Sequence, residues 1–539
     1  MAFIFLIFFL YAGRPVPDVN EAHYLAKAKH YWNPDWCAGD PFLESQDAHL
    51  VFNWTIGWLT LFFPMPAVAW IGRVLTWGLL AWSWQRLSFT LVPRPCLSLL
   101  SAGLFIFLLQ YFHMAGEWVL GGVEAKGFSF VFVFWGLHAL VRDRWAAAWI
   151  LFGVATCFHV LVGGWSMIAM AFAWFVSGRE RPAFFWQLPF FLLACVLALP
   201  GLVPGLALTW GADREIVEQA NQIYVYKRLS HHLAPHLFPP TYIPLPTFGT
   251  ETRLFIALPS KFIMRHVVLL LCWFVLWFFV KRETGQRPLQ RFVGGAVMIM
   301  AVGTVIDLAS VWLPTLSAAL LRFYWFRLSD VMLPIGVTFA SLAVACQLEK
   351  HRAVAVAWCL AAVLVVVAGN LMIPQFDRNL QVISAADHQI LQRTDQKRTR
   401  YHGRDEELLS QHRDWLKVCA WIRENTQPDD LFLTPRFQQT FKWNAERAEV
   451  VTWKDVPQDA AALIQWRERY QHVYPPTVYT WGLAAQTDGR LLSVAREYGA
   501  HYVVVDTSRY GRPVTLPRFY PNQFEENGSY EVYWVPPAD

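Results

Sequence analysis

The sequence predicts a polytopic α-helical membrane protein with about eleven transmembrane helices, followed by a soluble α/β domain at the C-terminal end. Three observations predict this class. Of the 539 residues, 55% are hydrophobic and 16% are charged, whereas a soluble domain carries about 25% charged residues. Apolar segments of helical length recur up to residue 373. Beyond that point the sequence becomes polar and alternates short β-branched runs with helical stretches.

The apolar segments are the candidate transmembrane helices. A helix that crosses the hydrocarbon core of about 30 Å needs about 20 residues. Ten segments meet or nearly meet this length: 66–84, 95–113, 124–141, 145–162, 165–177, 183–208, 265–280, 292–313, 329–348 and 353–373. The opening MAFIFLIFFLYAG has neither a basic start nor a small-residue cleavage site, so we interpret it as a short first span and not as a signal peptide.

The segment Ala48–Phe63 is ambiguous, and the charges of the loops decide its placement. If it lies in the membrane interface as an amphipathic helix, every short loop on one side of the membrane is basic. These loops contain Arg86, Arg94, Arg142, Arg144, Arg179, Arg181, Lys281, Arg282, Arg287, Arg291, Lys350 and Arg352. Basic loops mark the cytoplasmic side. We therefore expect a bacterial inner-membrane protein whose C-terminal domain is exported.

The expected organisation follows from these spans. Residues 1–373 form the transmembrane part, and two long exported loops interrupt it at 13–63 and 210–264. A polar linker covers 374–404, and the exported α/β domain covers 405–539. Membrane lipids are therefore expected partners.

The C-terminal part is predicted to form a βαβ-type sheet, because β-branched runs such as Leu431–Thr434 and Tyr502–Asp506 alternate with helical stretches. It contains no glycine-rich phosphate loop, which weakens a nucleotide-binding interpretation. The net charge of +5 comes without a basic run or a nucleic-acid motif, so nucleic acid is not an expected partner.

The first exported loop, DVNEAHYLAKAKHYWNPDWCAGDPFLES, concentrates acidic and aromatic residues. Glu21–Trp32 is predicted to be a helix on the membrane surface, with Asp18 or Asn20 as its N-cap. Asp18 is then either only this cap or, like Glu21, a general base that faces a cavity at the membrane surface. Tyr24 follows Glu21 by three residues and is a candidate substrate contact.

This loop resembles the first periplasmic loop of the GT-C superfamily glycosyltransferases, such as the lipid A aminoarabinose transferases and the protein O-mannosyltransferases. In those enzymes an acidic pair opens the loop helix, and a second interfacial helix precedes the next span. Here the pair position reads Asn20-Glu21, so its first acid is missing, although Asp18 lies nearby. The following span, AVAWIGRVLTWGLLAW, is similar to the arginine-containing span of that superfamily. The resemblance implies a GT-C-like membrane domain.

The resemblance also implies roles for residues of the second exported loop, HMAGEWVLGGVEAKGF. An acid at this place lies close to the first-loop carboxylate and helps to bind a divalent cation or the acceptor. Glu124 is the preferred candidate over Glu117, with Lys126 beside it as a substrate contact; an interfacial pair of Glu124 and Lys126 is the alternative. Two carboxylates would suit an inverting transfer in which a cation or an arginine holds the leaving phosphate.

Further candidates lie in later segments. Arg322 and Arg327 interrupt the aromatic residues of LLRFYWFRLSDVMLP on the exported side. Arginine suits bidentate binding of phosphate, so both are candidates for holding a lipid-phosphate leaving group; contact with lipid headgroups is the alternative. His159 is an ionisable residue in an apolar segment and could line the floor of a cavity. The alternative is an ordinary buried residue of the helix bundle.

Three functions remain open at this point. The first is a glycosyltransferase that moves a sugar from a polyprenyl-phosphate-linked donor to an exported acceptor. The second is a transporter or flippase for a lipid or an amphiphile, although the sequence shows no two equivalent halves with broken helices. The third is a catalytically degenerate GT-C relative that acts as a membrane scaffold, which the missing first acid favours.

Overall fold

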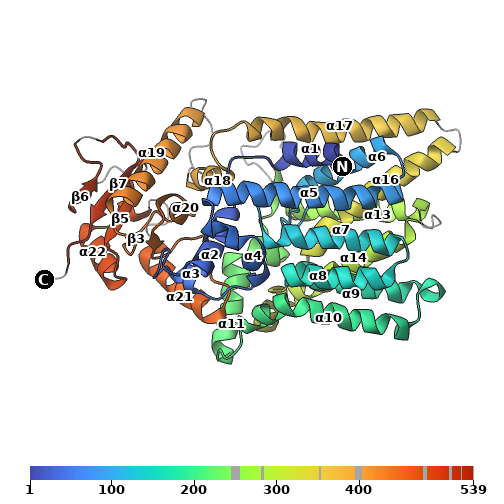
Figure 1. The fold of residues 1–539 in the computed structure, drawn as a ribbon, viewed down its shortest axis with the longest axis horizontal. Coiled ribbons are helices and arrows are strands. Elements are labelled where there is room, and N and C mark those ends of the chain that lie inside the picture. Colours follow the sequence, from blue (N-terminus) through green and yellow to red (C-terminus); the bar gives the residue numbers. More distant parts are fainter. Residues whose placement is uncertain are drawn as a thin grey trace.

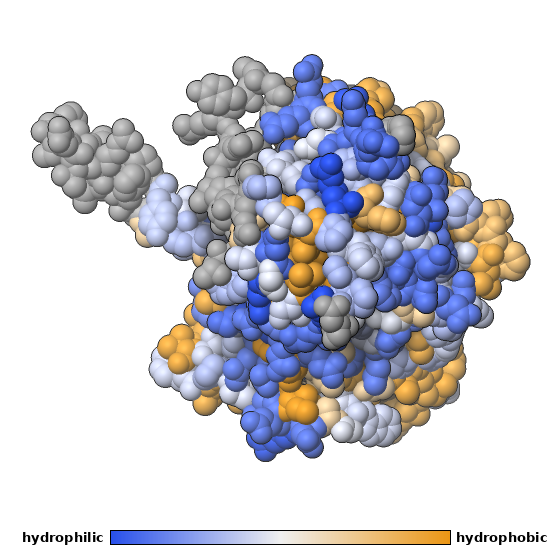
Figure 2. Space-filling model, turned by 90° about the vertical axis from the view of Figure 1, so that its left-hand side faces the viewer, coloured by the Kyte–Doolittle hydropathy of each residue, from blue (hydrophilic) through white to orange (hydrophobic). Residues whose placement is uncertain are grey.

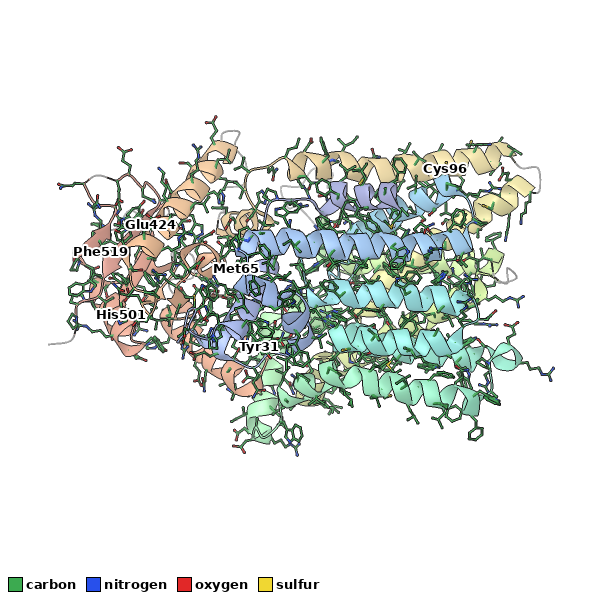
Figure 3. All side chains as sticks on the ribbon, viewed as in Figure 1. Tyr31, Met65, Cys96, Glu424, His501 and Phe519 are labelled. Atoms are coloured by element: carbon green, nitrogen blue, oxygen red, sulfur yellow. The ribbon has the colours of Figure 1, made fainter. Side chains whose placement is uncertain are left out.

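The computed structural model describes residues 1–244, 255–280, 285–350, 354–394, 404–476, 482–508, 513–523 and 525–537. Most of these residues are helical. Long helices lie side by side with nearly parallel axes, and the C-terminal strands gather at one end of them (Figure 1). Met65 lies at the end of this array near the C-terminal part, and Cys96 lies at the opposite end (Figure 3).

Within the described ranges, six helices are long and apolar enough to cross a membrane: α6 (Pro95–Phe112), α10 (Phe184–Ala207), α13 (Lys261–Val280), α14 (Arg287–Ala309), α16 (Arg327–Lys350) and α17 (Val354–Asn379). Four further apolar helices are shorter: α1 (Ala2–Ala12), α7 (Ala125–Val141), α8 (Trp145–Phe158) and α9 (Val160–Val176). The 27-residue helix α5 (Met65–Leu91) runs along them. Phe185 and Trp186 of α10 are 81% and 78% exposed. Such apolar exposure suits a lipid-facing surface.

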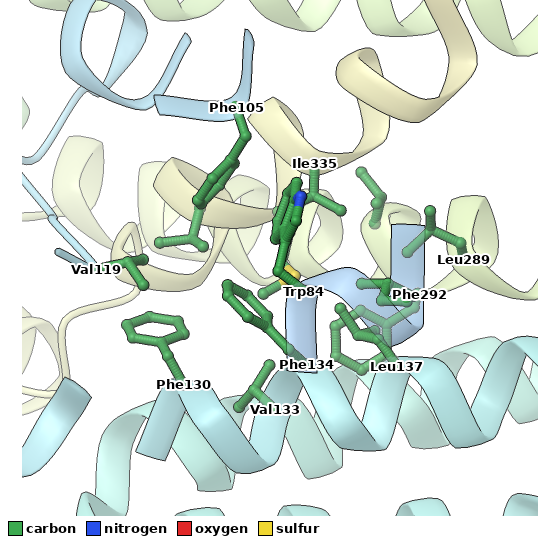
Figure 4. Packing of buried hydrophobic residues seen from close by; sticks show 14 of the residues in the cluster. Trp84, Phe105, Val119, Phe130, Val133, Phe134, Leu137, Leu289, Phe292 and Ile335 are labelled. Atoms are coloured by element: carbon green, nitrogen blue, oxygen red, sulfur yellow. The ribbon is translucent and has the colours of Figure 1, made fainter. Parts of the chain in front are cut away.

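The helices of the array pack around buried aromatic side chains. Trp84 of α5 stacks on Phe105 of α6 and Phe339 of α16, with ring centroids 4.5 and 5.4 Å apart, and meets Phe134 of α7 edge-on at 5.4 Å (Figure 4). Its indole Nε1 donates to Ser101 Oγ at 3.0 Å, which satisfies its polar atom inside the core. One tryptophan thus holds four helices together.

Helices α8 and α9 meet at His159. The sequence predicted the break between two spans at residues 163–164, and this prediction was wrong. His159 has extended backbone angles and separates the two helices, whereas Gly163 lies inside α9. A Cβ atom on Gly163 would lie 2.0 Å from the Thr156 backbone nitrogen. The glycine therefore permits close packing of α9 on α8 and is not a helix breaker.

The first long loop forms α2 (Glu21–Trp32), α3 (Pro41–Glu44), α4 (Leu50–Thr55) and the 3₁₀ turn η1 (Gly57–Leu61). The bounds of α2 are those predicted. Helix α4 and η1 contain 6 and 5 residues, so neither could reach across a hydrocarbon core. Asn20 is the N-cap residue of α2, and no capping bond from its side chain is present among the described residues.

The second long loop follows α10. It contains α11 (Arg214–Gln222), the π-helical turn η3 (Ile223–Arg228), α12 (Ser230–Leu233), η4 (Pro235–Leu237) and the antiparallel strands β1 (Thr241–Pro244) and β2 (Phe255–Leu258). Residues 245–254 of this predicted loop lie outside the described residues. His236 anchors the loop, since its Nδ1 lies 2.6 Å from Asp307 Oδ1 of α14. The short α15 (Pro314–Leu321) precedes α16.

After α17, helix α18 (Ala385–Thr394) precedes residues 395–403 of the predicted linker, which lie outside the described residues. The described C-terminal elements are α19 (Arg404–Asn425), β3 (Leu431–Leu433), α20 (Phe441–Ala445), β4 (Ala448–Glu449), α21 (Ala460–Val473), η6 (Gly482–Ala485), α22 (Asp488–Glu497), β5 (Tyr502–Asp506), β6 (Arg518–Tyr520) and β7 (Tyr530–Trp534). Five described strands form one sheet in the order β4-β3-β5-β7-β6. Strands β4, β3 and β5 are parallel, and β7 is antiparallel to β5 and β6.

Successive side chains of this sheet enter two different cores. Phe432, Val504 and Val532 pack with Trp415 of α19 on one face. Their neighbours Leu433, Val503, Val505 and Tyr533 pack with α21 and α22 on the other face. The alternation is the period-2 pattern of a strand buried on both sides. Seen end-on, the surface of this part is mainly hydrophilic, and hydrophobic residues gather toward the rim of the view (Figure 2).

Candidate functional site

Glu21, the first residue of α2, is buried completely at the end of α5. Arg73 of α5 donates from Nε to Glu21 Oε1 at 2.8 Å and from Nη2 to Oε2 at 2.6 Å. The backbone nitrogens of Val123 and Asp18 donate to the same two oxygens at 2.8 and 2.9 Å. Among the described residues, these four donors occupy both carboxylate oxygens. The arrangement holds α2, α5 and the loop between α6 and α7 together.

Asp18 joins the first loop to the second. Its Oδ2 accepts from the backbone nitrogen of Gly122 at 2.7 Å, and its Oδ1 accepts from Val19. Asp18 therefore holds Gly122 and is not the N-cap of α2, which is Asn20. A Cβ atom on Gly122 would lie 2.7 Å from Asp18 Cβ and 3.0 Å from Glu21 Cβ. Only glycine at this position allows the two loops to come so close.

Glu124 ends the second loop, directly before α7. It is buried, and its Oε1 accepts from the Trp118 indole nitrogen at 3.1 Å and from Asn20 Nδ2 at 3.5 Å. Asn20, which occupies the position of the missing first acid, thus touches Glu124. A shallow pocket opens here, and Glu124, Lys126, Trp118 and Gly122 are among the residues that line it.

Lys126 and Arg327 extend this arrangement into a set of buried ionic contacts. Lys126 Nζ lies 3.1 Å from Glu117 Oε1 and 3.8 Å from Glu124 Oε2, and 3.2 Å from the centroid of a Trp118 ring. Arg327 Nε, at the start of α16, lies 2.6 Å from Glu117 Oε2. We call Glu117, Glu124, Lys126 and Arg327 the charge network. Its members come from two segments that lie about two hundred residues apart in the sequence.

Asp330 fixes the part of the second loop that carries Glu117. Its two carboxylate oxygens accept from the backbone nitrogens of Met114, Ala115 and Glu117 at 2.7, 2.9 and 3.2 Å. Asp330 lies one helical turn after Arg327 on α16. The same helix therefore supplies the cation that pairs with Glu117 and the acceptor that orients its backbone.

His159 and Tyr24 lie beside the charge network. Arg327 Nη1 is 3.1 Å from His159 Nε2, and the His159 ring is 5.6 Å from the His49 ring. His49 Nε2 in turn lies 3.5 Å from the Tyr24 hydroxyl, and burial raises the pKa of Tyr24 well above its ordinary value. The structure therefore brings Glu124, Lys126, Arg327, His159 and Tyr24 into one connected region.

Arg322 lies at the margin of this region. Its Nη1 donates to Asn221 Oδ1 of α11 at 2.7 Å, and burial lowers its pKa. A pair of tyrosines separates it from Arg327: the Arg327 guanidinium lies 4.0 Å from the Tyr324 ring centroid, and the Tyr324 and Tyr224 hydroxyls are 3.0 Å apart. The two arginines predicted to act together thus have different partners.

A divalent cation does not fit this donor set. In the described part of the chain, no three His, Cys, Asp or Glu side chains form a group that could hold a metal ion. Between Glu117 and Glu124, the position that a bridging cation would require is taken by the ammonium group of Lys126.

Sequence reasoning overlooked two contributors to this region, Arg73 and His49, and ranked a third below Glu124. Arg73 is a charged residue in an apolar span, which is itself a signal of function or of a buried partner, but the sequence does not say which carboxylate it meets. Glu117 was placed second to Glu124, and the structure connects both to Lys126. His49 lies in the predicted interfacial segment and carried no signal of its own.

The array of apolar helices, with a helical first loop and a charge network at one end, defines the class: the chain is a multi-pass membrane protein with a GT-C fold. The oligosaccharyltransferase of Archaeoglobus fulgidus in its apo form matches it with a TM-score of 0.50 and 12% sequence identity, over 94% of this chain and 69% of that chain. At this identity the likeness shows the fold alone. The GT-C resemblance predicted from the first loop is confirmed at that level.

A second solved structure and one family model also match the chain. The archaeal oligosaccharyltransferase AglB from Archaeoglobus fulgidus, in complex with an inhibitory peptide and a dolichol-phosphate, matches with a TM-score of 0.47 and 12% identity, over 94% of this chain and 68% of that chain. Residues 413–473 match the model of a family described as a domain of unknown function, DUF6798. No curated protein matches the chain in sequence.

Proposed function

We propose that this chain is a GT-C-type glycosyltransferase that moves a sugar from a polyprenyl-phosphate-linked donor to an exported acceptor. The observation that carries the proposal is the charge network, buried beside the first loop in a chain with a GT-C fold. Sugar transfer from a phosphate ester needs a base for the acceptor hydroxyl and positive charge for the leaving phosphate. Two carboxylates and two cations in contact supply both kinds of group.

In this proposal Glu124 accepts the proton of the acceptor hydroxyl. Its carboxylate lines the pocket between the second loop and α5, and its partners there are neutral donors and one ammonium group. Asp18 lies beside it on the first loop. Glu21 was also predicted to be the general base, and this remains a prediction. Its four donors suit a different role, in which it holds the loop turn in place.

Arg327 and Lys126 are the proposed contacts of the leaving phosphate. The guanidinium of Arg327 is held by Glu117, His159 and the face of Tyr324. A guanidinium held in this way can present its remaining N–H groups to phosphate oxygens without losing much side-chain freedom. Arg322, Tyr24 and His159 are proposed to complete the substrate contacts at the margin.

The proposed topology has about eleven spans in residues 1–373, a linker over 374–404 and an exported domain over 405–539. Helices α9, α13 and α16 end, and α10, α14 and α17 begin, at the end of the helix array opposite the C-terminal part (Figure 1). Arg287 and Arg291 lie at that end, where both pair with Glu180 at 2.7 Å. Basic residues there support a cytoplasmic assignment, with the C-terminal part outside a bacterial inner membrane.

One observation favours a second candidate, a catalytically degenerate scaffold with the same fold. Asn20 stands where the superfamily has its first acid, and an amide cannot act as a general base. The two candidates differ in a simple respect: only the transferase consumes a lipid-linked sugar.

The test uses the full-length protein reconstituted in liposomes with a panel of radiolabelled polyprenyl-phosphate sugars and an extract of exported acceptors. We expect label to leave the lipid and to appear in a water-soluble or protein-bound product. Label that only changes leaflet while it stays on the lipid would identify a flippase. Label that stays on the lipid in its original leaflet, with every donor, would contradict the transferase and favour the scaffold.

A further inference from the structure

A second buried charge cluster joins the first exported loop to the C-terminal part, away from the charge network. At its centre is Lys442 of α20, which is 3% exposed. Its ammonium nitrogen lies 3.1 Å from Asp40 Oδ2, 2.6 Å from Glu449 Oε1 and 2.5 Å from Asp455 Oδ2. Asp40 belongs to the first loop, and Glu449 and Asp455 belong to the C-terminal part. A single cation therefore bridges two parts of the chain.

The partners of Lys442 hold two helices of the first loop, α2 and α3. Asp40 caps α3, since its Oδ1 accepts from the backbone nitrogens of Phe42 and Leu43, and its Oδ2 also accepts from the backbone nitrogen of Glu449 at 3.1 Å. Asp455 Oδ1 lies 3.1 Å from His23 Nδ1 on α2. His23 follows Glu21 by two residues, so the cluster reaches the turn that carries Glu21.

Contacts around the cluster strengthen the same junction. Glu446 accepts from Lys29 and from the Trp36 indole nitrogen, both at 3.3 Å, and Asp459 accepts from the backbone nitrogen of Gln46. Trp443 and Ala448 of the C-terminal part share one apolar cluster with Ala22, Leu25, Cys37, Phe42 and Leu43 of the first loop. The first loop is thus packed between the helix array and the C-terminal part.

Lys442 is the cation at the centre of the three acidic side chains that it contacts. Removal of one partner of a buried ion pair is strongly destabilising because it leaves the other charge uncompensated. Loss of the ammonium group would leave Asp40 and Asp455 facing each other across the junction. The junction should then open, whereas a surface pair would lose little.

We propose that Lys442 is a positioning residue for the candidate site: it docks the C-terminal part onto α2 and α3, and so fixes the turn of the first loop that carries Asp18 and Glu21. The role in transfer rests on the proposed function, but the docking does not. Residues 413–473, which match the domain of unknown function, contain Lys442, Glu449 and Asp455. The proposed role of residues 413–473 is to hold the exported loop of a GT-C fold.

Two native cysteines report on docking separately from folding. Cys37 of the first loop is 2% exposed and lies in the apolar cluster shared with Trp443 and Ala448. Cys419 of α19 is completely buried within the C-terminal core, among Trp415, Phe432 and Val504. Undocking should expose Cys37 alone, whereas unfolding of the C-terminal part should expose Cys419 as well.

The experiment treats the full-length protein in detergent with a water-soluble maleimide and follows each cysteine-containing peptide by mass spectrometry. In Lys442→Met, Cys37 should react about 100-fold faster than in the unmodified protein, while Cys419 stays protected. Lys417→Met, at an exposed position of α19, is the matched control and should leave both rates unchanged. Asp40→Asn is the second variant. It keeps the cap of α3 because Asn caps about as well as Asp, and it leaves the contacts of Lys442 within the C-terminal part intact.

The outcomes separate docking from transfer. Protection of Cys37 in Asp40→Asn, or equal labelling of Cys37 and Cys419 in both variants, would overturn the docking role.

Where transfer is measurable, Lys442→Met should lower kcat at least tenfold with little change in KM for the donor, and Lys442→Arg should restore part of kcat. Exposure of Cys37 with an unchanged kcat would overturn the positioning role and leave the proposed function standing. An unmodified protein that transfers no sugar contradicts the proposed function alone, because the labelling result is independent of it.

Discussion

Arg73 and Glu21 form a bidentate ion pair in which both side chains are fully buried. The pair joins the ninth residue of α5 to the first residue of α2. Arg73 Nη1 also donates to the Arg14 carbonyl oxygen at 2.5 Å, so the same guanidinium holds the chain segment that enters the loop. Arg73 therefore contributes to the position of the first loop through both of these contacts.

This relationship predicts how the protein responds when the pair is broken. Glu21→Gln should lower the free energy of unfolding by about 3–5 kcal/mol, because Arg73 remains buried without its counter-charge. Thermal unfolding of the purified protein measures the effect. Replacement of both residues, Glu21→Met with Arg73→Met, should recover only part of the loss, because it removes the unpaired charge but leaves the backbone nitrogens of Val123 and Asp18 without their acceptor. A single variant as stable as the unmodified protein would show that the pair does not hold the loop.

A second prediction concerns the contact between the loop that carries Asp18 and the loop that carries Gly122. Gly122→Ala should destabilise the protein by about 1–3 kcal/mol, because the new methyl group would overlap Asp18 Cβ and Glu21 Cβ. The melting temperature measures the loss. Gly78→Ala on α5 is the control, since a Cβ atom there meets no atom within 4 Å. If both alanine variants melt at the temperature of the unmodified protein, the close approach of the two loops is not maintained in solution.

A third prediction is a dependence of stability on pH at the Lys442 cluster. Burial raises the pKa of Glu449 to about 8, and the nearby carboxylates of Asp455 and Asp40 act in the same direction against the effect of Lys442. The folded protein therefore keeps a proton on Glu449 that the unfolded chain loses above its ordinary value of 4.5. Because the folded state binds more protons in this window, the stability contribution of Glu449 falls as pH rises from about 4.5 to about 8.

Glu449→Gln isolates this contribution, because glutamine resembles the neutral acid and has no proton to lose. The melting temperature of the variant relative to the unmodified protein should rise between pH 5 and pH 8 and level off above pH 8. Glu424→Gln, at an exposed position of α19, controls for the loss of a negative charge. A constant difference between Glu449→Gln and the unmodified protein across this range would mean that Glu449 is ionised in the folded state throughout.

A fourth prediction addresses the leaving phosphate. Arg327→Lys keeps a positive charge opposite Glu117 but removes the planar group that also reaches His159 and Tyr324. Donor binding should weaken about tenfold. Arg322→Lys should have a smaller effect, because Arg322 is held by Asn221 at the margin. Titration with a fluorescent polyprenyl phosphate measures both affinities. Donor affinities equal to that of the unmodified protein in both variants would remove these arginines from the site.

Local patterns predicted much of the fold. The apolar segments were recognisable because the composition and the length of a segment decide whether it can span a bilayer. Helix α2 and strand β5 have the predicted bounds because their periodicities are regular. The five-residue helix α20 and the three-residue strand β6 were missed because such short elements carry no period. Both are fixed by the tertiary contacts of the C-terminal part.

The candidate site was less accessible to sequence reasoning. Glu124 and Lys126 are near neighbours in sequence, and their contact could be anticipated. The pairs Glu21–Arg73 and Glu117–Arg327 could not, because the sequence shows which charges are buried but not which distant partner each one meets. The Lys442 cluster was missed for the same reason.

The most direct test of the account is the rate of sugar transfer by Glu124→Gln. The measurement follows labelled sugar from a polyprenyl-phosphate donor in membranes that contain equal amounts of each protein, with donor binding measured in parallel. Gln preserves the shape of the side chain and removes the base, so transfer should fall by roughly 10²-fold or more while donor binding and melting temperature hold. Asp18→Asn, which can still accept from Gly122, should cost less. Full transfer activity in Glu124→Gln would contradict the proposed role of Glu124, and loss of activity in Asp18→Asn alone would move the base to Asp18.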